Sequence, residues 1–281
     1  MTTNRKRLAI VTPQHRYPLT AEEQVSLRHM RHFLGEFDRF LICPETSTPD
    51  LSDFILLRVP DQDLAGIPAY SRLLMSKRFY QWFADYDYIL IYQFDCLAFS
   101  HNILDWCDQG YDYIGAPWFQ SFGDDSSGGF IGVGNGGLSL RKVKSHLEVL
   151  NSNQFSQLPV PTDWLNPSFV PSLRQRVRFH MKSAYKGVQH YAGVSRAIDA
   201  YVEEVCSRNS VHEDQFWSWA APLFKPDFRI PTCEQALSFA FECAPRVCLE
   251  ANQGRMPFGC HAWAKFDRAF WEPFLLEPGS Q

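Results

Sequence analysis

Asp95 stands at the end of a strongly apolar run, Tyr88–Phe94 (YILIYQF), where a side chain could do chemistry. A carboxylate at the end of a buried strand costs free energy unless it is paired or bound to a cation. Mg²⁺ or Mn²⁺ held by Asp95 would neutralise the charge on a diphosphate leaving group. Gln93 projects in the same direction as Asp95 and could hydrogen-bond a ribose or a base. The alternative is that Asp95 only caps the following turn.

Two adjacent acids, Glu213 and Asp214, form a second candidate site in the segment HEDQFWSW. One of them could act as a general base on an acceptor hydroxyl, because the aromatic residues around them would raise a carboxyl pKa. Trp217 belongs to that aromatic wall, and Trp118 is a further flat ring that could stack on a sugar. The competing interpretation is that the two acids only complement the dipole of a helix start.

A histidine and a glycine cluster complete the set of candidates. His261, in PFGCHAW, could be a Mn²⁺ ligand, although a single loop histidine is more often only hydrogen-bonded. The cluster Gly134–Arg141 (GNGGLSLR) allows close backbone approach to a ligand. Within it, Asn135, Gly136 and Gly137 are candidates for sugar contacts, or else for an ordinary bulged turn. The cluster does not match the phosphate-binding loop of nucleotide triphosphatases.

The elements that must position these residues alternate between strands and helices. Apolar runs predict the strands, and spacings of three and four predict the helices. A Thr20–Glu23 capping box precedes the first helix. The expected strands are 8–12, 40–43, 54–59, 88–94, 113–118 and 133–141, and the expected helices begin after Thr20 and cover about 68–84 and 194–206. This order predicts an α/β fold with a mostly parallel sheet, whose ligands bind beyond the carboxyl ends of its strands.

Residues 151–210 are less regular and carry a basic segment, Arg174–Lys186. Such a segment is usually a solvated helix face, and we favour that interpretation. The alternative is contact with an anionic acceptor or with the head groups of a membrane.

The composition is that of a globular protein, with 45% hydrophobic and 21% charged residues. A net charge of −4 gives no sign of nucleic-acid binding. The eight cysteines form no CxxC pair and are interpreted as reduced core thiols. No apolar run is long enough for a signal peptide core or a membrane span, which predicts a cytoplasmic protein, at most peripheral to a membrane.

Taken in order, the sequence resembles a glycosyltransferase of the GT-A fold. More narrowly, it resembles a bacterial and fungal glycosyltransferase-like family catalogued as a domain of unknown function. The likeness lies in residues 88–99, 106–118 (WCDQGYDYIGAPW), 133–141, 212–218 and 257–263, together with the first strand. It implies one domain over 1–281, with a nucleotide-sugar-binding half at 1–120 and an acceptor-side half at 121–281. A variable helical insert at about 151–210 would set the acceptor.

The resemblance also implies roles for single residues. Asp95 matches the last acid of the DxD motif, with Gln93 in place of the first, and His261 matches the histidine that completes the Mn²⁺ or Mg²⁺ site. Asp214 matches the catalytic base of inverting members, with Glu213 positioning the acceptor.

On the donor side, the resemblance implies that Thr12 meets the nucleotide. From the placement of their helix, Lys77 or Arg72 could touch the diphosphate. The implied activity is transfer from a nucleotide sugar to a glycan or lipid-linked glycan in surface polysaccharide biosynthesis. Two rival functions remain: a metal-dependent nucleotide-sugar hydrolase, and an inactive or carbohydrate-binding module. Gln93, which stands in place of the first acid of the DxD motif, favours the second.

Overall fold

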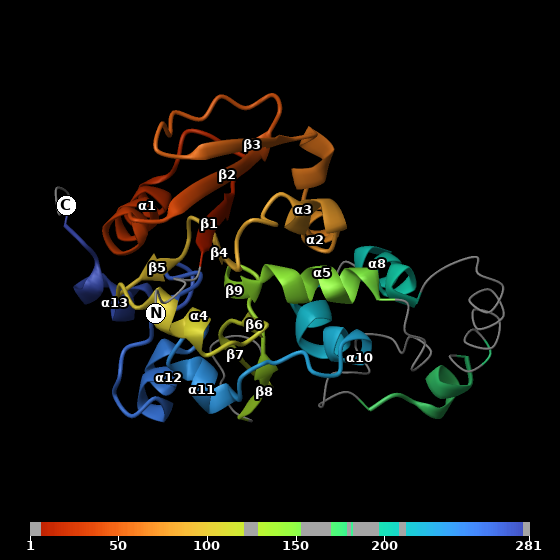
Figure 1. Cartoon of the computed structure of the whole chain (residues 1–281). Helices are drawn as coiled ribbons and strands as arrows, with labels where there is room; N and C mark the ends of the chain where they lie inside the picture. The colour runs from red at the N-terminus through yellow and green to blue at the C-terminus, as the bar shows by residue number, and fades with distance from the viewer. Residues whose placement is uncertain are drawn as a thin grey trace, which may run out of the picture.

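A computed structural model describes residues 7–120, 129–152, 170–178, 181, 197–207 and 212–277. Its centre is a six-stranded sheet in the order β3-β2-β1-β4-β9-β6 (Figure 1). The strands are β1 Leu8–Pro13, β2 Asp38–Pro44, β3 Ile55–Val59, β4 Tyr88–Tyr92, β6 Tyr113–Ile114 and β9 Leu138–Lys142. Strands β1 to β4 are mutually parallel, and β9 runs antiparallel between β4 and β6. The predicted α/β fold with a mostly parallel sheet is confirmed.

Both faces of this sheet are buried, as the unbroken apolar runs of its central strands require. Along β1, Ala9 and Val11 belong to one core cluster, and Leu8 and Ile10 belong to the other. The helices are α1 Ala21–Leu34, α2 Ile67–Leu74, α3 Lys77–Gln81, α4 Ile103–Asp108, α5 Val143–Asn151, α8 Ala197–Ser207, α9 Glu213–Gln215, α10 Ala221–Phe224, α11 Cys233–Leu237, α12 Pro245–Ala251 and α13 Arg268–Trp271. Helix α1 packs on the Leu8 face, whereas α2, α3 and α5 pack on the Ala9 face.

Local signals decide where the first helices begin and end. The predicted capping box of α1 is present, because Thr20 and Glu23 exchange side-chain and backbone hydrogen bonds. The single helix expected at 68–84 is instead two helices, α2 and α3. Ser76 breaks it, because its extended backbone and side chain cap the start of α3, where its hydroxyl accepts a hydrogen bond from Phe79 N–H.

Beyond the main sheet the strands are short. The run expected as one strand at 113–118 divides into β6 and β7 (Pro117–Phe119), and β7 pairs with β8 (Phe130–Val133). A third sheet joins β5 (Leu97–Ala98), β10 (Ala240–Phe241) and β11 (Gly259–Cys260). This third sheet brings the C-terminal segment to the end of β4. Residues 121–128 and most of the insert expected at 151–210 lie outside the described residues.

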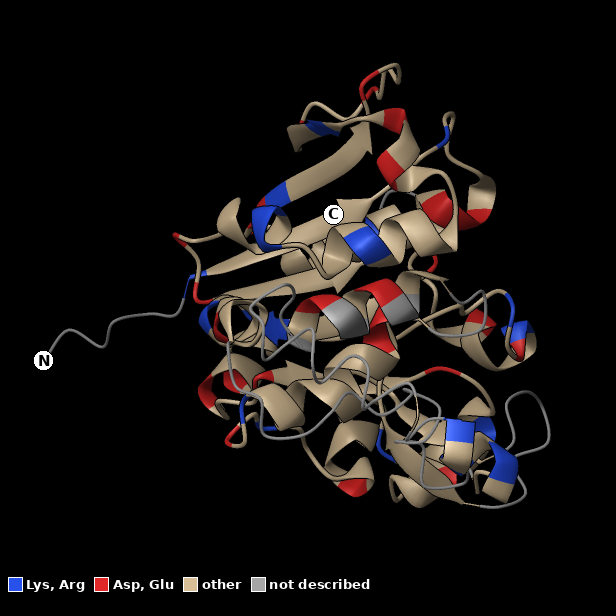
Figure 2. Ribbon diagram, turned by 90° about the vertical axis from the view of Figure 1, so that its right-hand side faces the viewer, with Lys and Arg blue, Asp and Glu red and all other residues tan. Residues whose placement is uncertain are grey.

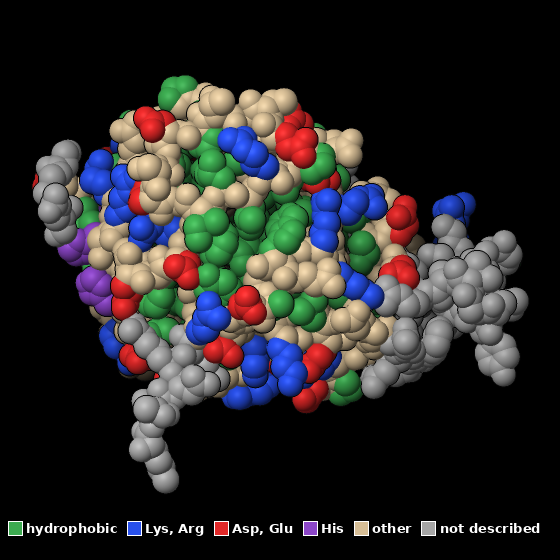
Figure 3. Space-filling view, turned by 45° about the horizontal axis from the view of Figure 1, so that its top comes forward, with side chains coloured by type: hydrophobic (Ala, Val, Ile, Leu, Met, Phe, Trp, Pro, Cys, Tyr) green, Lys and Arg blue, Asp and Glu red, His purple; other side chains and the backbone are tan. Residues whose placement is uncertain are grey.

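The cysteines lie inside the folded protein, and charged side chains lie on its surface. Seven of the eight cysteines are buried, and Cys233 is half-buried. In the space-filling view of Figure 3, hydrophobic side chains gather in a hollow at the centre of the face, with charged side chains around it. In the part of the chain that the structure describes, no helix has the length and apolar character needed to cross a bilayer.

His146 on α5 predicts a loss of stability in acid. Its ring is buried against Tyr80 and Trp217, and its Nδ1 donates to the carbonyl of Lys142. Burial, and then the charge of Arg141, lower its pKa well below the ordinary value, so the native state keeps it neutral. Below pH about 6.5 His146 binds a proton in the unfolded chain but stays neutral in the native protein. The free energy of unfolding therefore falls by at most about 1.4 kcal/mol per pH unit.

We therefore expect His146→Phe to flatten the fall in unfolding free energy between about pH 7.5 and 5.5. Urea unfolding at both pH values measures it. His101→Gln, at an exposed histidine, is the matched control for the loss of an imidazole. An equal fall in wild type and His146→Phe would contradict a neutral buried imidazole.

Candidate active site

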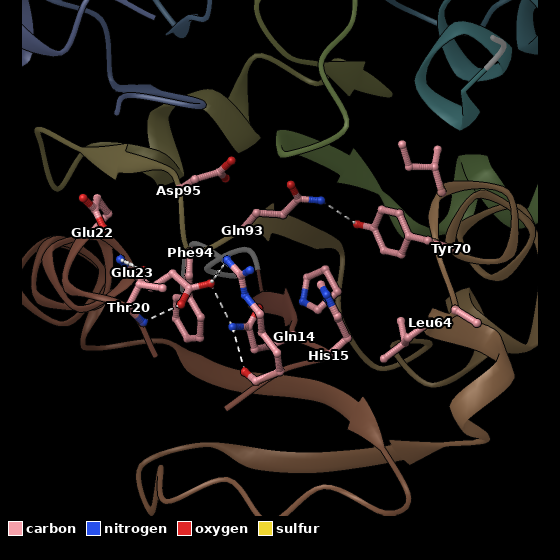
Figure 4. A pocket seen from close by; sticks show the side chains of 15 residues that line it. Gln14, His15, Thr20, Glu22, Glu23, Leu64, Tyr70, Gln93, Phe94 and Asp95 are labelled. Carbon is pink, nitrogen blue, oxygen red and sulfur yellow. Dashed lines mark hydrogen bonds and ion pairs between the residues drawn. The ribbon is translucent and has the colours of Figure 1, made fainter. Parts of the chain in front are cut away.

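Two polar loops meet at the carboxyl edge of the sheet because β1 and β4 are parallel neighbours. Gln14, His15 and Arg16 follow β1, and Gln93 and Asp95 follow β4. Together with the start of α2 they line a cavity of about 640 Å³ (Figure 4). This is the edge at which the order of strands and helices predicts a ligand site.

Glu23 organises one wall of this first cavity. Its carboxylate accepts hydrogen bonds from Gln14 Nε2 at 3.0 Å and from Thr20 N–H at 2.7 Å, and it lies 3.4 Å from Arg16. On the opposite wall Gln93 Nε2 donates to the Tyr70 hydroxyl at 3.3 Å. The Tyr70 hydroxyl accepts this bond, so its own proton is free to reach a ligand.

Asp95 and His261, 166 positions apart in sequence, face each other with Oδ1 and Nε2 3.4 Å apart. The other ring nitrogen, Nδ1, lies 2.9 Å from Oε1 of Glu242, which follows β10. Burial opposes the charged form of His261, but the charges of Asp95 and Glu242 and their hydrogen bonds raise its pKa to about 10. The half-exposed Asp95 carboxylate stays ionised, because His261 lowers its pKa against the opposing effect of burial.

These residues fit a divalent cation. Glu242 holds the proton on Nδ1, so Nε2 is the atom that could bind a metal beside Asp95, a common carboxylate–histidine arrangement. With a pKa of about 10, His261 would have to lose the Nε2 proton when the cation binds. In the described part of the chain no three histidine, cysteine or acidic side chains form a complete metal cluster. Two protein ligands suit Mg²⁺ or Mn²⁺ when substrate phosphates supply the remaining oxygens.

Gly137 makes room for this histidine. A Cβ on Gly137 would lie 2.1 Å from Nε2 of His261, so no side chain fits there. Gly136 is also confined, because a Cβ would lie 2.6 Å from Oε1 of Glu213. The glycines singled out from the sequence thus allow a close approach, but the groups that approach them are protein side chains.

Asp214 lies in a second cavity of about 560 Å³, which shares Ile67, Tyr70 and Gln93 with the first. His261 and Glu242 line this cavity too. The Asp214 carboxylate accepts hydrogen bonds from Gly136 N–H at 3.2 Å and Gln215 N–H at 2.9 Å. Burial, and then the negative charge of Glu242, raise the pKa of Asp214 to about 6. A base with this pKa is ionised yet able to take a proton near neutral pH.

Glu213 also lines the second cavity, but its carboxylate is paired inside the protein. Its two oxygens bind the Arg141 guanidinium at 2.8 and 3.0 Å, and both side chains are buried. Tyr80 adds a hydroxyl contact to the same guanidinium. The ion pair with Arg141 anchors the start of α9. The acceptor-positioning role of Glu213 stays a prediction.

Asn135 and Trp118, both expected to contact a sugar, do line the second cavity. Asn135 has a positive φ of 75°, and its Oδ1 accepts hydrogen bonds from Gly137 and Leu138. Its Nδ2 has no hydrogen-bond partner among the described residues. Trp118 packs edge-on against Trp219, with ring centroids 5.1 Å apart.

Four predicted contact residues lie away from these cavities. Thr12 is buried and its hydroxyl donates to the Tyr92 carbonyl at 2.8 Å, which leaves none of its side chain for a nucleotide. Arg72 pairs with Glu203 at 3.8 Å, and neither Arg72 nor Lys77 lines either cavity. Trp217 is fully buried against His146.

A π-helical turn, η2 (Phe216–Ala220), explains the position of Trp217. The turn follows α9 directly, and it leaves Trp217 in the core while Trp219 lines the second cavity. Of the two tryptophans expected in the aromatic wall, Trp219 lines the cavity and Trp217 does not. Periodicity cannot show such an irregular turn.

Sequence reasoning also missed several polar residues of the site: Gln14, His15, Arg16, Tyr70, Glu242 and Lys265. The first three directly follow the first predicted strand, so the rule that ligands bind at carboxyl ends could have found them. Glu242 carries no such signal, because a short strand far along the chain brings it to His261.

Comparison with known proteins gives a family and two solved structures. The family described as "Protein of unknown function (DUF5672)" matches residues 54–261. A structure of the galactosyltransferase LgtC in complex with donor and acceptor sugar analogs is 14% identical, with 96% of this chain and 98% of that chain covered and a TM-score of 0.46. An active-site mutant of LgtC is also 14% identical, with 90% and 86% covered and a TM-score of 0.44.

At 14% identity, the similarity to LgtC gives no information on the roles of individual residues. Among curated proteins, none matches the chain. The family match, by contrast, covers well over half of the sequence and includes Gln93, Asp95, Asp214, Glu242 and His261. The chain belongs to the family of proteins of unknown function DUF5672.

Proposed function

We propose that this protein is a glycosyltransferase, which moves a sugar from a nucleotide donor to an acceptor hydroxyl. The observation that carries the proposal is the meeting of Asp95 and His261 at the sheet edge. Asp214 supports it from the connected second cavity, where a carboxyl of raised pKa suits a general base. A binding module would not require a carboxylate with this pKa.

The first cavity is the proposed donor site. Gln14, His15 and Arg16 bind the nucleotide at the carboxyl edge, while Gln93 and Tyr70 lie where the two cavities join. Asp95 and His261 would hold Mn²⁺ or Mg²⁺, which supplies positive charge to the departing diphosphate. Arg16 adds a fixed positive charge to the donor cavity, and Lys265 adds another at the second cavity.

The second cavity is the proposed acceptor site. Asp214 takes the proton of the acceptor hydroxyl as that oxygen attacks the anomeric carbon, and direct displacement inverts this centre. Trp118 and Trp219 offer aromatic surface to a sugar ring, and the Asn135–Gly137 turn faces the same space. The proposed acceptor is a glycan or a lipid-linked glycan, and the proposed pathway is the assembly of surface polysaccharide.

A thermal-shift panel of nucleoside diphosphates and their sugars, with and without Mn²⁺, tests the proposal. A true donor at about 100 times its Kd should add about 2.7 kcal/mol of stability. Asp95→Asn and His261→Gln should abolish the part of that gain that depends on Mn²⁺, because each removes one of the two ligands. Asp227→Asn, at an exposed carboxylate, is the matched control.

The rival functions give different results in the same set of experiments. A hydrolase would release free sugar from the donor without any acceptor. A binding module would show the thermal shift and no turnover. No nucleotide-dependent shift with any base would contradict the donor site itself.

A further inference from the structure

The segment 170–181 carries an apolar stripe that the rest of the described chain does not cover. Val170, Leu173, Val177 and Met181 are 82%, 79%, 52% and 72% exposed. Leu173, Val177 and Met181 are four positions apart, a spacing that is typical of one face of a helix. Single exposed apolar residues are ordinary, but an aligned set of them marks an interaction surface.

The helix that bears this stripe is specified locally. Pro171 precedes it, and Ser172 and Gln175 form a capping box, with Ser172 N–H donating to Gln175 Oε1 at 2.7 Å and Gln175 N–H donating to the Ser172 hydroxyl. Residues 173–178 are helical as a result. The helical conformation of these residues therefore follows from the sequence of the segment itself.

Basic side chains flank the stripe. Arg174, Arg176 and Arg178 are all exposed, and Figure 2 shows basic positions on the short helix beside the grey trace at its lower right. From residue 170 to residue 186 the sequence holds five Lys and Arg and no acidic residue, in a chain whose net charge is −4. A solvated polar face, which the sequence favoured, explains the arginines but leaves the apolar stripe unexplained.

We propose that the 170–181 segment binds the surface of an anionic membrane, with the apolar stripe in the acyl boundary and the arginines at lipid phosphates. Amphipathic basic helices bind in this manner, by apolar burial together with attraction to anionic lipid. Charge selects this partner, because an acid-free basic segment in an acidic protein matches a negative surface. The proposal is independent of the glycosyltransferase activity, and its test uses no substrate.

Co-sedimentation of the full chain with sucrose-loaded vesicles tests it, using phosphatidylcholine alone and phosphatidylcholine with about one third phosphatidylglycerol. The wild type should bind the anionic vesicles and not the neutral ones, and added salt should weaken binding. Arg174→Gln/Arg176→Gln/Arg178→Gln should weaken binding on the order of 100-fold, since each arginine near the surface is worth about fivefold. Leu173→Asp/Val177→Asp should abolish it.

Two controls separate membrane binding from general effects. Val247→Asp places a charge at a 40% exposed apolar residue on α12, and Lys144→Gln removes an exposed cation from α5. Both should bind anionic vesicles as the wild type does. The proposal is overturned if the wild type ignores anionic vesicles, if the controls lose as much as the segment variants, or if Leu173→Asp/Val177→Asp instead dissociates a dimer that binds no vesicle.

Discussion

Asp214→Asn should lower turnover by about 10²- to 10⁴-fold, the usual contribution of a general base. The substitution removes the proton acceptor but keeps the size of the side chain. Gly136 N–H and Gln215 N–H donate to different oxygens of Asp214, so the one oxygen of Asn keeps one of these two hydrogen bonds. The Asp95–His261 pair is untouched, so donor-dependent thermal stabilisation should survive. Steady-state kinetics and thermal shift on one preparation measure both.

The pH dependence gives a second test of the same residue. Because only ionised Asp214 can accept the proton, kcat/KM should fall about tenfold per pH unit below its pKa of about 6. Stability should change with pH in the opposite direction to kcat/KM. The native state holds the proton more tightly than the unfolded state, so stability decreases as pH rises from the unfolded pKa towards 6.

Asp214→Asn should therefore be at least as stable as the wild type at neutral pH. Exposed Asp227 again provides the control, since Asp227→Asn should keep both the turnover and the fall of kcat/KM below pH about 6. Normal turnover in Asp214→Asn would refute the assignment of the base. A large loss of stability would instead show that the carboxylate serves the fold.

Arg141→Met should destabilise the protein by about 3–5 kcal/mol, because it leaves the buried Glu213 carboxylate without its partner. Glu213→Leu should cost a similar amount, because it leaves the buried guanidinium charge without a carboxylate, although Ser139 and Tyr80 still accept hydrogen bonds from it. Removing both together should be much less harmful, since replacing a buried pair with apolar groups is often neutral or stabilising. Chemical unfolding of the two single variants and the double variant measures this coupling.

The exposed pair Arg268–Glu272 on α13 and the following turn offers a matched comparison, with N–O separation of 3.1 Å. Arg268 also pairs with Glu22 at 3.1 Å, and Arg268→Ala should change the unfolding free energy by less than about 1 kcal/mol, because solvent screens both exposed pairs. Additive effects of the two buried substitutions would show that Arg141 and Glu213 act separately. That result would remove the basis for treating Glu213 as the anchor of α9.

Much of the fold could be predicted from local patterns. Apolar runs predicted β1, β2, β3 and β4, and the strands expected at 113–118 and 133–141 contain β6 and most of β9. Thr20 and Glu23 predicted the start of α1, because strand burial and capping depend on neighbours in sequence. The prediction of a single helix at 68–84 was wrong in one respect. Ser76 caps a second helix there, and this single polar side chain outweighed the continuous apolar pattern.

By itself, the sequence determined which residues could do chemistry and at which edge of the sheet they stand. Asp95 ends its most apolar run, and Asp214 and His261 lie in segments rich in aromatic residues. Only the tertiary structure decided how these side chains point. It pairs Glu213 with Arg141, buries Trp217 while Trp219 lines the cavity, and brings Glu242 to His261. The two pairs join residues 72 and 19 positions apart, and the periodicity of a single segment does not encode such contacts.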